Sequence, residues 1–170
     1  MRKLISITVI MLLLASAAPS VFAQAKFGHI NTNELLRQMP GRDEAQQELE
    51  KYARELEEMF VALQSEFQTK YQNFLENEST FSELIKQSRQ RELQSLQERI
   101  MEFQESAQED LVTKENSLLS PIIEKARKAI DDVAKENGYT YVFDLSTGAF
   151  LYAEPSDNIM PMVKAKLGIQ

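Results

Sequence analysis

The residues that could do chemistry are few, and their spacing does not assemble a catalytic site. His29 is the only histidine and the chain has no cysteine, which leaves too few ligands for the usual structural zinc sets, and we expect no histidine-based nucleophile triad. Asp43-Glu44 and Glu57-Glu58 are neighbours in helix-like stretches, so each pair points to different faces and we interpret these carboxylates as solvated. Asp144 closes a strand-like run and is interpreted as a turn or capping carboxylate. With no glycine-rich phosphate loop either, we predict a protein that is not an enzyme and has no catalytic, metal or cofactor site.

The negative charge is concentrated in one segment of the chain. The sequence has 19 Lys and Arg against 26 Asp and Glu, and residues 42–120 alone hold 9 basic and 18 acidic side chains, a net −9. Nucleic-acid binding would need a basic patch, and docking on an anionic membrane would need positive charge. We therefore expect neither a nucleic-acid partner nor electrostatic docking on a membrane.

The first 23 residues have the form of a secretory signal peptide. Arg2 and Lys3 precede an apolar run, Leu4 to Ala18, and Val21-Phe22-Ala23 provides small residues for cleavage before Gln24. The apolar run is shorter than the roughly 20 residues of a spanning helix, so we expect it to be removed rather than kept as an anchor. Without cysteine, no lipid can be attached to an N-terminal cysteine, which leaves free secretion or a periplasm.

Residues 42–120 are predicted to be helical throughout. They contain neither glycine nor proline, the two strongest breakers of local structure. A disordered polar tract would lack periodicity, whereas apolar residues here recur every three or four positions: Ala45, Leu49, Tyr52, Leu56, Phe60, Leu63, Phe67, Tyr71 and Phe74, then Phe81, Ile85, Leu93, Leu96, Ile100, Phe103, Ala107 and Leu111. Each half therefore has one apolar stripe that needs a partner.

The two stripes are predicted to pack against each other as an antiparallel helical hairpin rather than a single rod. Asn77, Glu78, Ser79 and Thr80 would form the tip, with Thr80 as the N-cap of the second helix. Reversal near position 78 would set Phe60 against Leu96 and Phe74 against Phe81. The polar run 86–92 interrupts this seam, so we expect a weakly packed distal third in which Phe67 meets Arg89 through a cation–π contact.

The ends of the chain supply the sheet. Residues 25–30 read as a strand and 34–39 as a short helix, while YTYVFDLSTGAFLYAEP, residues 139–155, reads as a β-hairpin. Pro121 suggests a kink or a fresh helix start, and a last helix is expected from about residue 157. The predicted class is α+β: a small β body made by 24–41 and 121–170, with the helical hairpin 42–120 inserted as an arm.

Several stretches of this order resemble the Skp/OmpH-type periplasmic chaperones, in the form found in Bacteroidetes-like bacteria. They are KFGHINT with ELL at 26–36, EKYA with ELE at 50–57, and GYTYVFD with LY at 138–152. The resemblance implies a homotrimer whose strands form a central β body and whose three arms surround a cavity. Unfolded outer-membrane β-barrel proteins would be held in that cavity without ATP, in the periplasm.

The resemblance and the pattern together give candidate residues. Candidates for client binding are Met59, Val61, Phe67, Tyr71, Phe74, Leu75 and Met101, and candidates for the β body and trimer core are Phe27, Ile30, Tyr141, Phe143 and Leu151. Family members from enteric bacteria have basic arms connected with lipopolysaccharide, whereas these arms are acidic, so we do not carry over a lipopolysaccharide site. The alternative is a periplasmic coiled-coil adaptor or spacer that docks on a fixed partner.

Overall fold

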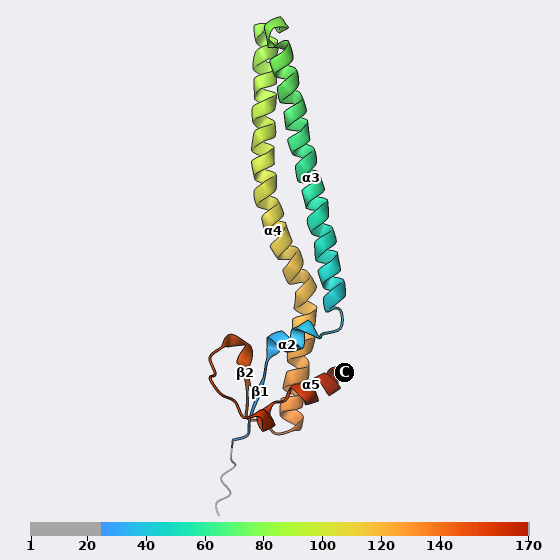
Figure 1. Cartoon of the computed structure of the whole chain (residues 1–170), viewed down its shortest axis with the longest axis vertical. Coiled ribbons are helices and arrows are strands. Elements are labelled where there is room, and N and C mark those ends of the chain that lie inside the picture. The colour runs from blue at the N-terminus through green and yellow to red at the C-terminus, as the bar shows by residue number, and fades with distance from the viewer. Residues whose placement is uncertain (1–24, 170) are drawn as a thin grey trace, which may run out of the picture.

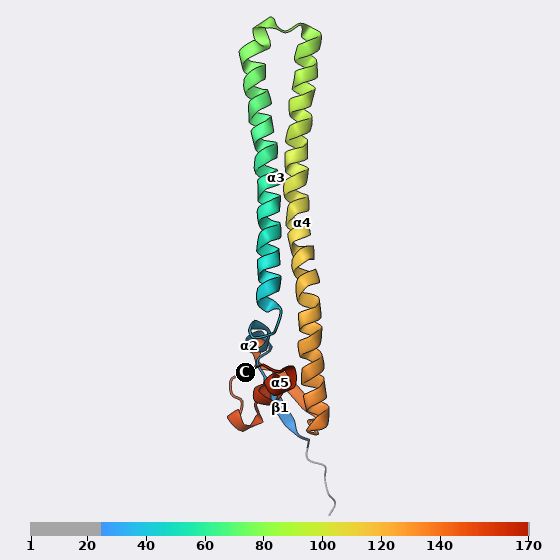
Figure 2. The same ribbon diagram turned by 90° about the vertical axis from the view of Figure 1, so that its right-hand side faces the viewer.

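The computed structural model describes residues 25–169 as a long two-helix arm rising from a small α/β body (Figure 1). The view turned by 90° shows the same two helices side by side along the whole arm (Figure 2). The predicted signal peptide lies outside the described residues. Within 25–169, no helix combines the length and apolar character needed to cross a membrane. The predicted α+β class with an inserted helical hairpin is confirmed.

The arm consists of α3, Arg42–Asn77, a 3₁₀ turn at Glu78–Thr80, and α4, Glu83–Glu136. The predicted cap at Thr80 is wrong, because the Thr80 hydroxyl donates to the Asn77 carbonyl at 2.7 Å inside the turn. Ser82 caps α4 instead, and its hydroxyl accepts from the Ile85 amide at 3.4 Å. This wider turn changes which residues face each other away from the tip.

The register along the arm is shifted from the predicted one. Phe74 meets Phe81 at a ring separation of 6.3 Å, as expected. Farther from the tip, Phe60 stacks on Phe103 at 6.5 Å rather than lying against Leu96. The shift follows from the turn, since α4 begins only at Glu83. An apolar stripe tolerates such slippage because every third or fourth residue offers a similar surface.

The prediction that Pro121 causes a kink or starts a new helix was wrong. α4 continues through it for 54 residues, and the helix bends only gently in the lower part of the arm (Figure 1). A proline removes one N–H from the helix ladder and leaves the carbonyl four residues earlier without its partner. Pro121 and Ser117 are both exposed, so water can serve that carbonyl and the helix can continue.

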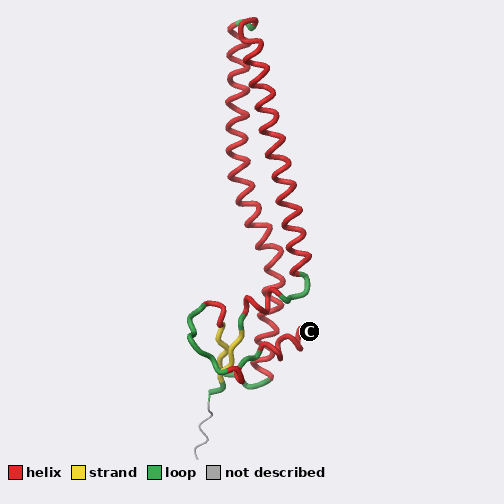
Figure 3. The backbone as a smooth tube through the Cα atoms, in the orientation of Figure 1, coloured by secondary structure: helices red, strands yellow, loops and turns green. Residues whose placement is uncertain are grey.

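The body contains β1, Phe27–Ile30, α2, Thr32–Arg37, β2, Tyr141–Asp144, and α5, Met160–Leu167. The predicted second strand of the C-terminal hairpin is not formed. Instead, β1 and β2 pair in parallel, with Phe27 opposite Tyr141 and Ile30 opposite Asp144. Figure 3 shows these two strands together, while the chain after β2 swings away as a loop.

Local hydrogen bonds explain why residues 145–154 leave the sheet. The Asp144 carboxylate accepts from the Ser146 amide at 2.9 Å and so starts a 3₁₀ turn at Leu145–Thr147. Gly148 ends this turn with φ of 70°, a left-handed conformation that suits glycine. On its other side, β1 is already bonded to the chain before α5, because the Ile159 amide donates to the His29 carbonyl at 2.9 Å. The other edge of β1 is thereby occupied, and the turn after Asp144 carries the chain away from the free edge of β2.

The core of the body lies between the inner face of the sheet and the helices α2, α4 and α5. Its fully buried side chains are Ile30, Leu35, Ile159 and Val163. Gly28 lies in the middle of β1, where a Cβ atom would stand only 2.9 Å from Ile159 Cγ2 and from the Tyr139 ring. The strand can approach these groups only because residue 28 has no side chain.

Asp144 links the end of β2 to the start of α2 by hydrogen bonds. Its carboxylate accepts from the Thr32 amide at 3.1 Å, from the Thr32 hydroxyl at 2.6 Å, and from the Ser146 amide and hydroxyl at 2.9 and 2.8 Å. Partial burial raises the pKa of this carboxyl, but the hydrogen bonds from Thr32 and Ser146 outweigh burial and hold the pKa below its usual value of 3.8. The interpretation of Asp144 as a turn and capping carboxylate is confirmed.

We expect Asp144→Asn to destabilise the body at pH 7 by about 1–3 kcal/mol, because an amide cannot accept all four donors. A carboxylate with a lowered folded pKa adds stability above pH 3.8 that is lost as the pH falls through the folded value. Urea unfolding at pH 7 and pH 3 should therefore show a smaller loss on acidification for the variant than for the wild type. Equal losses in both proteins would contradict this role.

Candidate functional site

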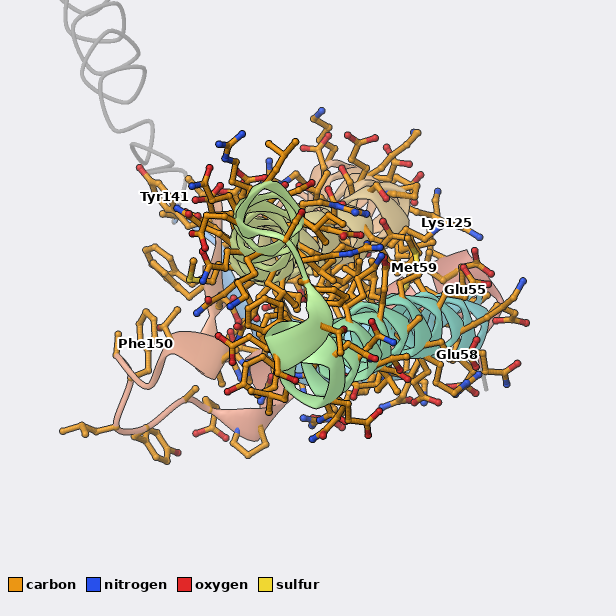
Figure 4. The ribbon with its side chains drawn as sticks, turned by 90° about the horizontal axis from the view of Figure 1, so that it is seen from above. Glu55, Glu58, Met59, Lys125, Tyr141 and Phe150 are labelled. Atoms are coloured by element: carbon orange, nitrogen blue, oxygen red, sulfur yellow. The ribbon has the colours of Figure 1, made fainter. Side chains whose placement is uncertain are left out.

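The arm exposes most of the apolar side chains expected to contact clients. Met59 is 56% exposed, and Val61, Tyr71, Leu75 and Met101 are exposed to a similar degree. Figure 4, a view down the arm, shows Met59 beside α3 on the side of the molecule away from Tyr141 and Phe150. These residues form a scattered apolar surface along the arm rather than one pocket.

Two of the candidates belong to the packing of the arm. Phe74 is buried against Phe81 near the tip. Phe67 is half-buried and stacks on Tyr71, one turn farther along α3, with a ring separation of 6.0 Å. The predicted cation–π contact with Arg89 is not formed, because the Arg89 guanidinium bonds the Glu92 carboxylate at 2.8 Å.

The distal seam is held by charged groups as well as aromatic rings. Lys70 on α3 pairs with Glu92 on α4 and lies 3.7 Å from Glu66. The hydrogen bond from Lys70, followed by that from Arg89, lowers the pKa of the Glu92 carboxyl, and the bond to Glu92 raises the pKa of Lys70. These pairs are only partly exposed, and ion pairs in contact with water contribute little to stability.

The sequence reasoning missed an apolar patch beside the tip. Leu84, in the first turn of α4, is 77% exposed, and Ile85 and Leu75 near it are exposed as well. The expected tip residues Asn77, Glu78, Ser79 and Thr80 do form the turn. The signal that could have revealed the patch is that Leu84 stands next to the apolar stripe rather than in it, so packing within the hairpin cannot bury it.

The outer face of the sheet carries a second exposed apolar surface, which we call the aromatic face. It is made by Phe27, Tyr141, Phe143 and Phe150. The ring centroid of Phe27 lies 5.9 Å from that of Tyr141 and 6.1 Å from that of Phe143, and both pairs are stacked. The ring centroids of Phe143 and Phe150 are 5.1 Å apart. Figure 4 shows Tyr141 and Phe150 projecting from the same side of the molecule.

The remaining candidates for the body core, Ile30 and Leu151, have different surroundings. Ile30 is buried on the inner face, within the core of the single chain. Leu151 is fully exposed in the loop after β2, and Tyr152 beside it is also exposed. The predicted strand 139–143 forms at Tyr141–Asp144, and the N-terminal strand expected in the same sheet pairs with it as β1, whereas the second strand of the hairpin is not formed.

The side chain of His29, on β1, forms a hydrogen bond with the end of this loop. Its Nε2 lies 2.9 Å from the Glu154 carbonyl, and since a carbonyl only accepts, Nε2 carries the proton. Nδ1 is buried without a hydrogen-bond partner. Among the described residues, no three His, Cys, Asp or Glu side chains gather closely enough to bind a metal ion.

The comparisons with known proteins agree with this architecture. The profile of the family described as Outer membrane protein (OmpH-like) matches residues 26–167. No curated protein matches the chain significantly. A crystal structure described as an OmpH-like outer membrane chaperone from Caulobacter crescentus CB15 superposes with a TM-score of 0.72 at 13% identity, covering 88% of this chain and 86% of that one.

At such low identity the structural match shows a shared fold, while the family profile covers the arm and the body together. The resemblance inferred from the sequence is thereby confirmed. The chain belongs to the OmpH-like outer membrane protein family.

Proposed function

We propose that this protein is an ATP-independent chaperone of the periplasm that holds unfolded outer-membrane β-barrel proteins. The observation that carries the proposal is the long, thin arm that leaves Met59, Val61, Tyr71, Leu75 and Met101 exposed. Together these side chains give an unfolded client several apolar points of contact along the arm. Holding without energy input needs many weak and exchangeable contacts, which flexible methionines on a separate arm suit.

The proposed working form is a homotrimer. Large aromatic side chains on the aromatic face remain in contact with water in the single chain, and β2 has one unpaired edge. Association of copies through this body would cover both the apolar face and the strand edges. Three arms would then extend from the same body and enclose a space for the client.

The proposed location follows from residues 1–23, whose sequence has the form of a cleavable export signal. It also agrees with the similar protein from Caulobacter crescentus CB15, which is described as an outer membrane chaperone. The acidic arms give no reason to add lipopolysaccharide as a ligand.

The test is an aggregation assay with several unrelated denatured outer-membrane barrels, diluted from urea into buffer with the mature protein. We expect aggregation, followed by light scattering, to be suppressed at about one trimer per client and without ATP. Sedimentation velocity on the same samples counts the subunits in the complex. The proposal would be contradicted if the protein suppressed the aggregation of none of these clients.

A second candidate function is a periplasmic adaptor or spacer. The exposed patch of Leu75, Leu84 and Ile85 beside the tip favours it, since a fixed partner could dock there. The two functions differ in selectivity. An adaptor would bind one native partner tightly and leave denatured barrels to aggregate, and Leu84→Ser would abolish that binding.

A further inference from the structure

Small residues open a groove in the middle of the arm. Between α3 and α4 lies a space of about 530 Å³, floored by Ala62, Leu63, Phe103 and Ser106, with Met59 at its side. Ala62 and Ser106 are too short to close the gap between the two helices at this level. The groove therefore offers an apolar floor that a side chain from another molecule can reach.

Charged side chains form the rim of this groove. Glu66, Glu102 and Arg99 line it. Lys70 forms ion pairs with both Glu66 and Glu92. Its pair with Glu92 on α4 belongs to the distal seam. Glu102 has no ion pair among the described residues. A ligand at this level of the arm meets an apolar floor beside two carboxylates and the guanidinium of Arg99.

The charge of the arm changes along its length, and the groove lies at the boundary. Residues 42–58 and 98–115, the half near the body, carry thirteen acidic and five basic side chains, a net −8. Residues 59–97, the half that includes the tip, carry five acidic and four basic side chains, a net −1. In the acidic half, the ion pairs formed are Lys51 with Glu55 and Lys114 with Glu48, so most of its carboxylates are not neutralised.

We propose that the groove selects unfolded segments in which an apolar side chain is flanked by lysine or arginine. This inference rests on the proposed chaperone function and names its substrate class. The apolar side chain would enter between Met59 and Phe103, while the cations would lie against Glu66 and Glu102 at the rim. Segments rich in Asp and Glu are disfavoured by like-charge repulsion, which acts as selection against the wrong partner.

The inference can be tested with three fluorescent peptides that share one apolar centre and differ only in flanking Lys, Gln or Glu residues. Binding to the full mature protein is measured by fluorescence anisotropy. At low salt we expect the Lys peptide to bind at least about 10-fold more tightly than the Glu peptide. At about 0.5 M salt this ratio should fall to about 2-fold, because the Debye length has shrunk to a few ångströms.

Two matched double variants separate the groove from the general charge of the arm. Glu66→Gln with Glu102→Gln neutralises the rim, whereas Glu50→Gln with Glu115→Gln makes the same charge change at exposed positions outside the groove. We expect the rim variant to reduce the preference for the Lys peptide by at least about threefold and the control to leave it nearly unchanged. Met59→Ala should weaken all three peptides by a similar factor, since it alters the apolar wall and not the charge.

Equal binding of the Lys and Glu peptides would overturn the inference, as would equal effects of the two double variants. Either result leaves the chaperone function intact if denatured barrels are still held in solution. Failure of the aggregation assay itself would instead overturn the chaperone function, so the two failures can be told apart.

Discussion

Replacing Phe143 with Asp is expected to convert the proposed trimer into monomers and to abolish the holding of clients. Phe143 stands at the centre of the aromatic face, in contact with both Phe27 and Phe150. Withdrawing it from a shared core removes about 1 kcal/mol of apolar burial per copy, and a carboxylate in its place adds a desolvation cost of several kcal/mol. Because each trimer contains three copies, we expect the dissociation constant to rise by at least about 10³-fold.

Sedimentation velocity at micromolar protein measures this effect, and the aggregation assay on the same variant measures its consequence. Phe143 also packs within its own chain, so Tyr141→Asp provides a second variant at a position that is 57% exposed. The control is Tyr71→Asp on the arm, whose exposure of 44% is close to the 38% of Phe143. If both body variants remain trimers as stable as the wild type, the aromatic face is not the subunit interface.

The second large effect is expected from Gly28→Val, which should unfold the body while leaving the arm helical. Even the first added carbon would stand 2.9 Å from Ile159 Cγ2 and from the Tyr139 ring. Ile159 is fully buried, so it cannot rotate into solvent to make room. Overpacking of this kind costs about 1–3 kcal/mol, occasionally more, and here it acts in a two-stranded sheet with few other contacts.

In a Tyr52→Phe, Tyr71→Phe background, which removes the tyrosines of the arm, near-UV circular dichroism of the body tyrosines during urea unfolding separates the body from the arm. Gly28→Ala should show the same effect in weaker form, and adding Ile159→Ala should recover part of the loss. Gly148→Ala is the control: no atom lies within 4 Å of its added carbon, so its cost is limited to about 1–2 kcal/mol for the left-handed backbone. A Gly28→Val protein with wild-type stability would show that the strand can shift away from Ile159.

The arm could be predicted from the sequence because its signals are local. The absence of glycine and proline over residues 42–120 and the apolar stripes need no knowledge of the rest of the chain. The register was less predictable, because Thr80 and Ser82 are both good N-caps and the choice between them shifts the facing residues. Phe74 and Phe81, next to the turn, kept their predicted pairing, whereas Phe60 faces Phe103.

Strand pairing was the part that local patterns could not supply. Residues 141–144 do form a strand, but alternation does not say whether the partner is the next apolar run or one far away. Here the Asp144 carboxylate turned the chain before residues 149–153 could pair back. The N-terminal strand Phe27–Ile30, which was expected in the same sheet, pairs directly with β2 in parallel. Of the exposed candidates on the arm, Tyr71 belongs to the apolar stripe, whereas Met59, Val61, Leu75 and Met101 lie beside it, as does Leu84, which was missed.

The pairing of β1 with β2 also bears on how the chain folds. Phe27 and Tyr141 are neighbours in the sheet although the whole arm separates them in sequence, and closing a flexible loop of that length costs several kcal/mol in chain entropy. Helical hairpins rely on contacts that are nearer in sequence and form quickly. If the arm zips from its tip first, it brings the two strands together with only short linkers left to close. The arm would then act as the folding template of its own body, before any client reaches it.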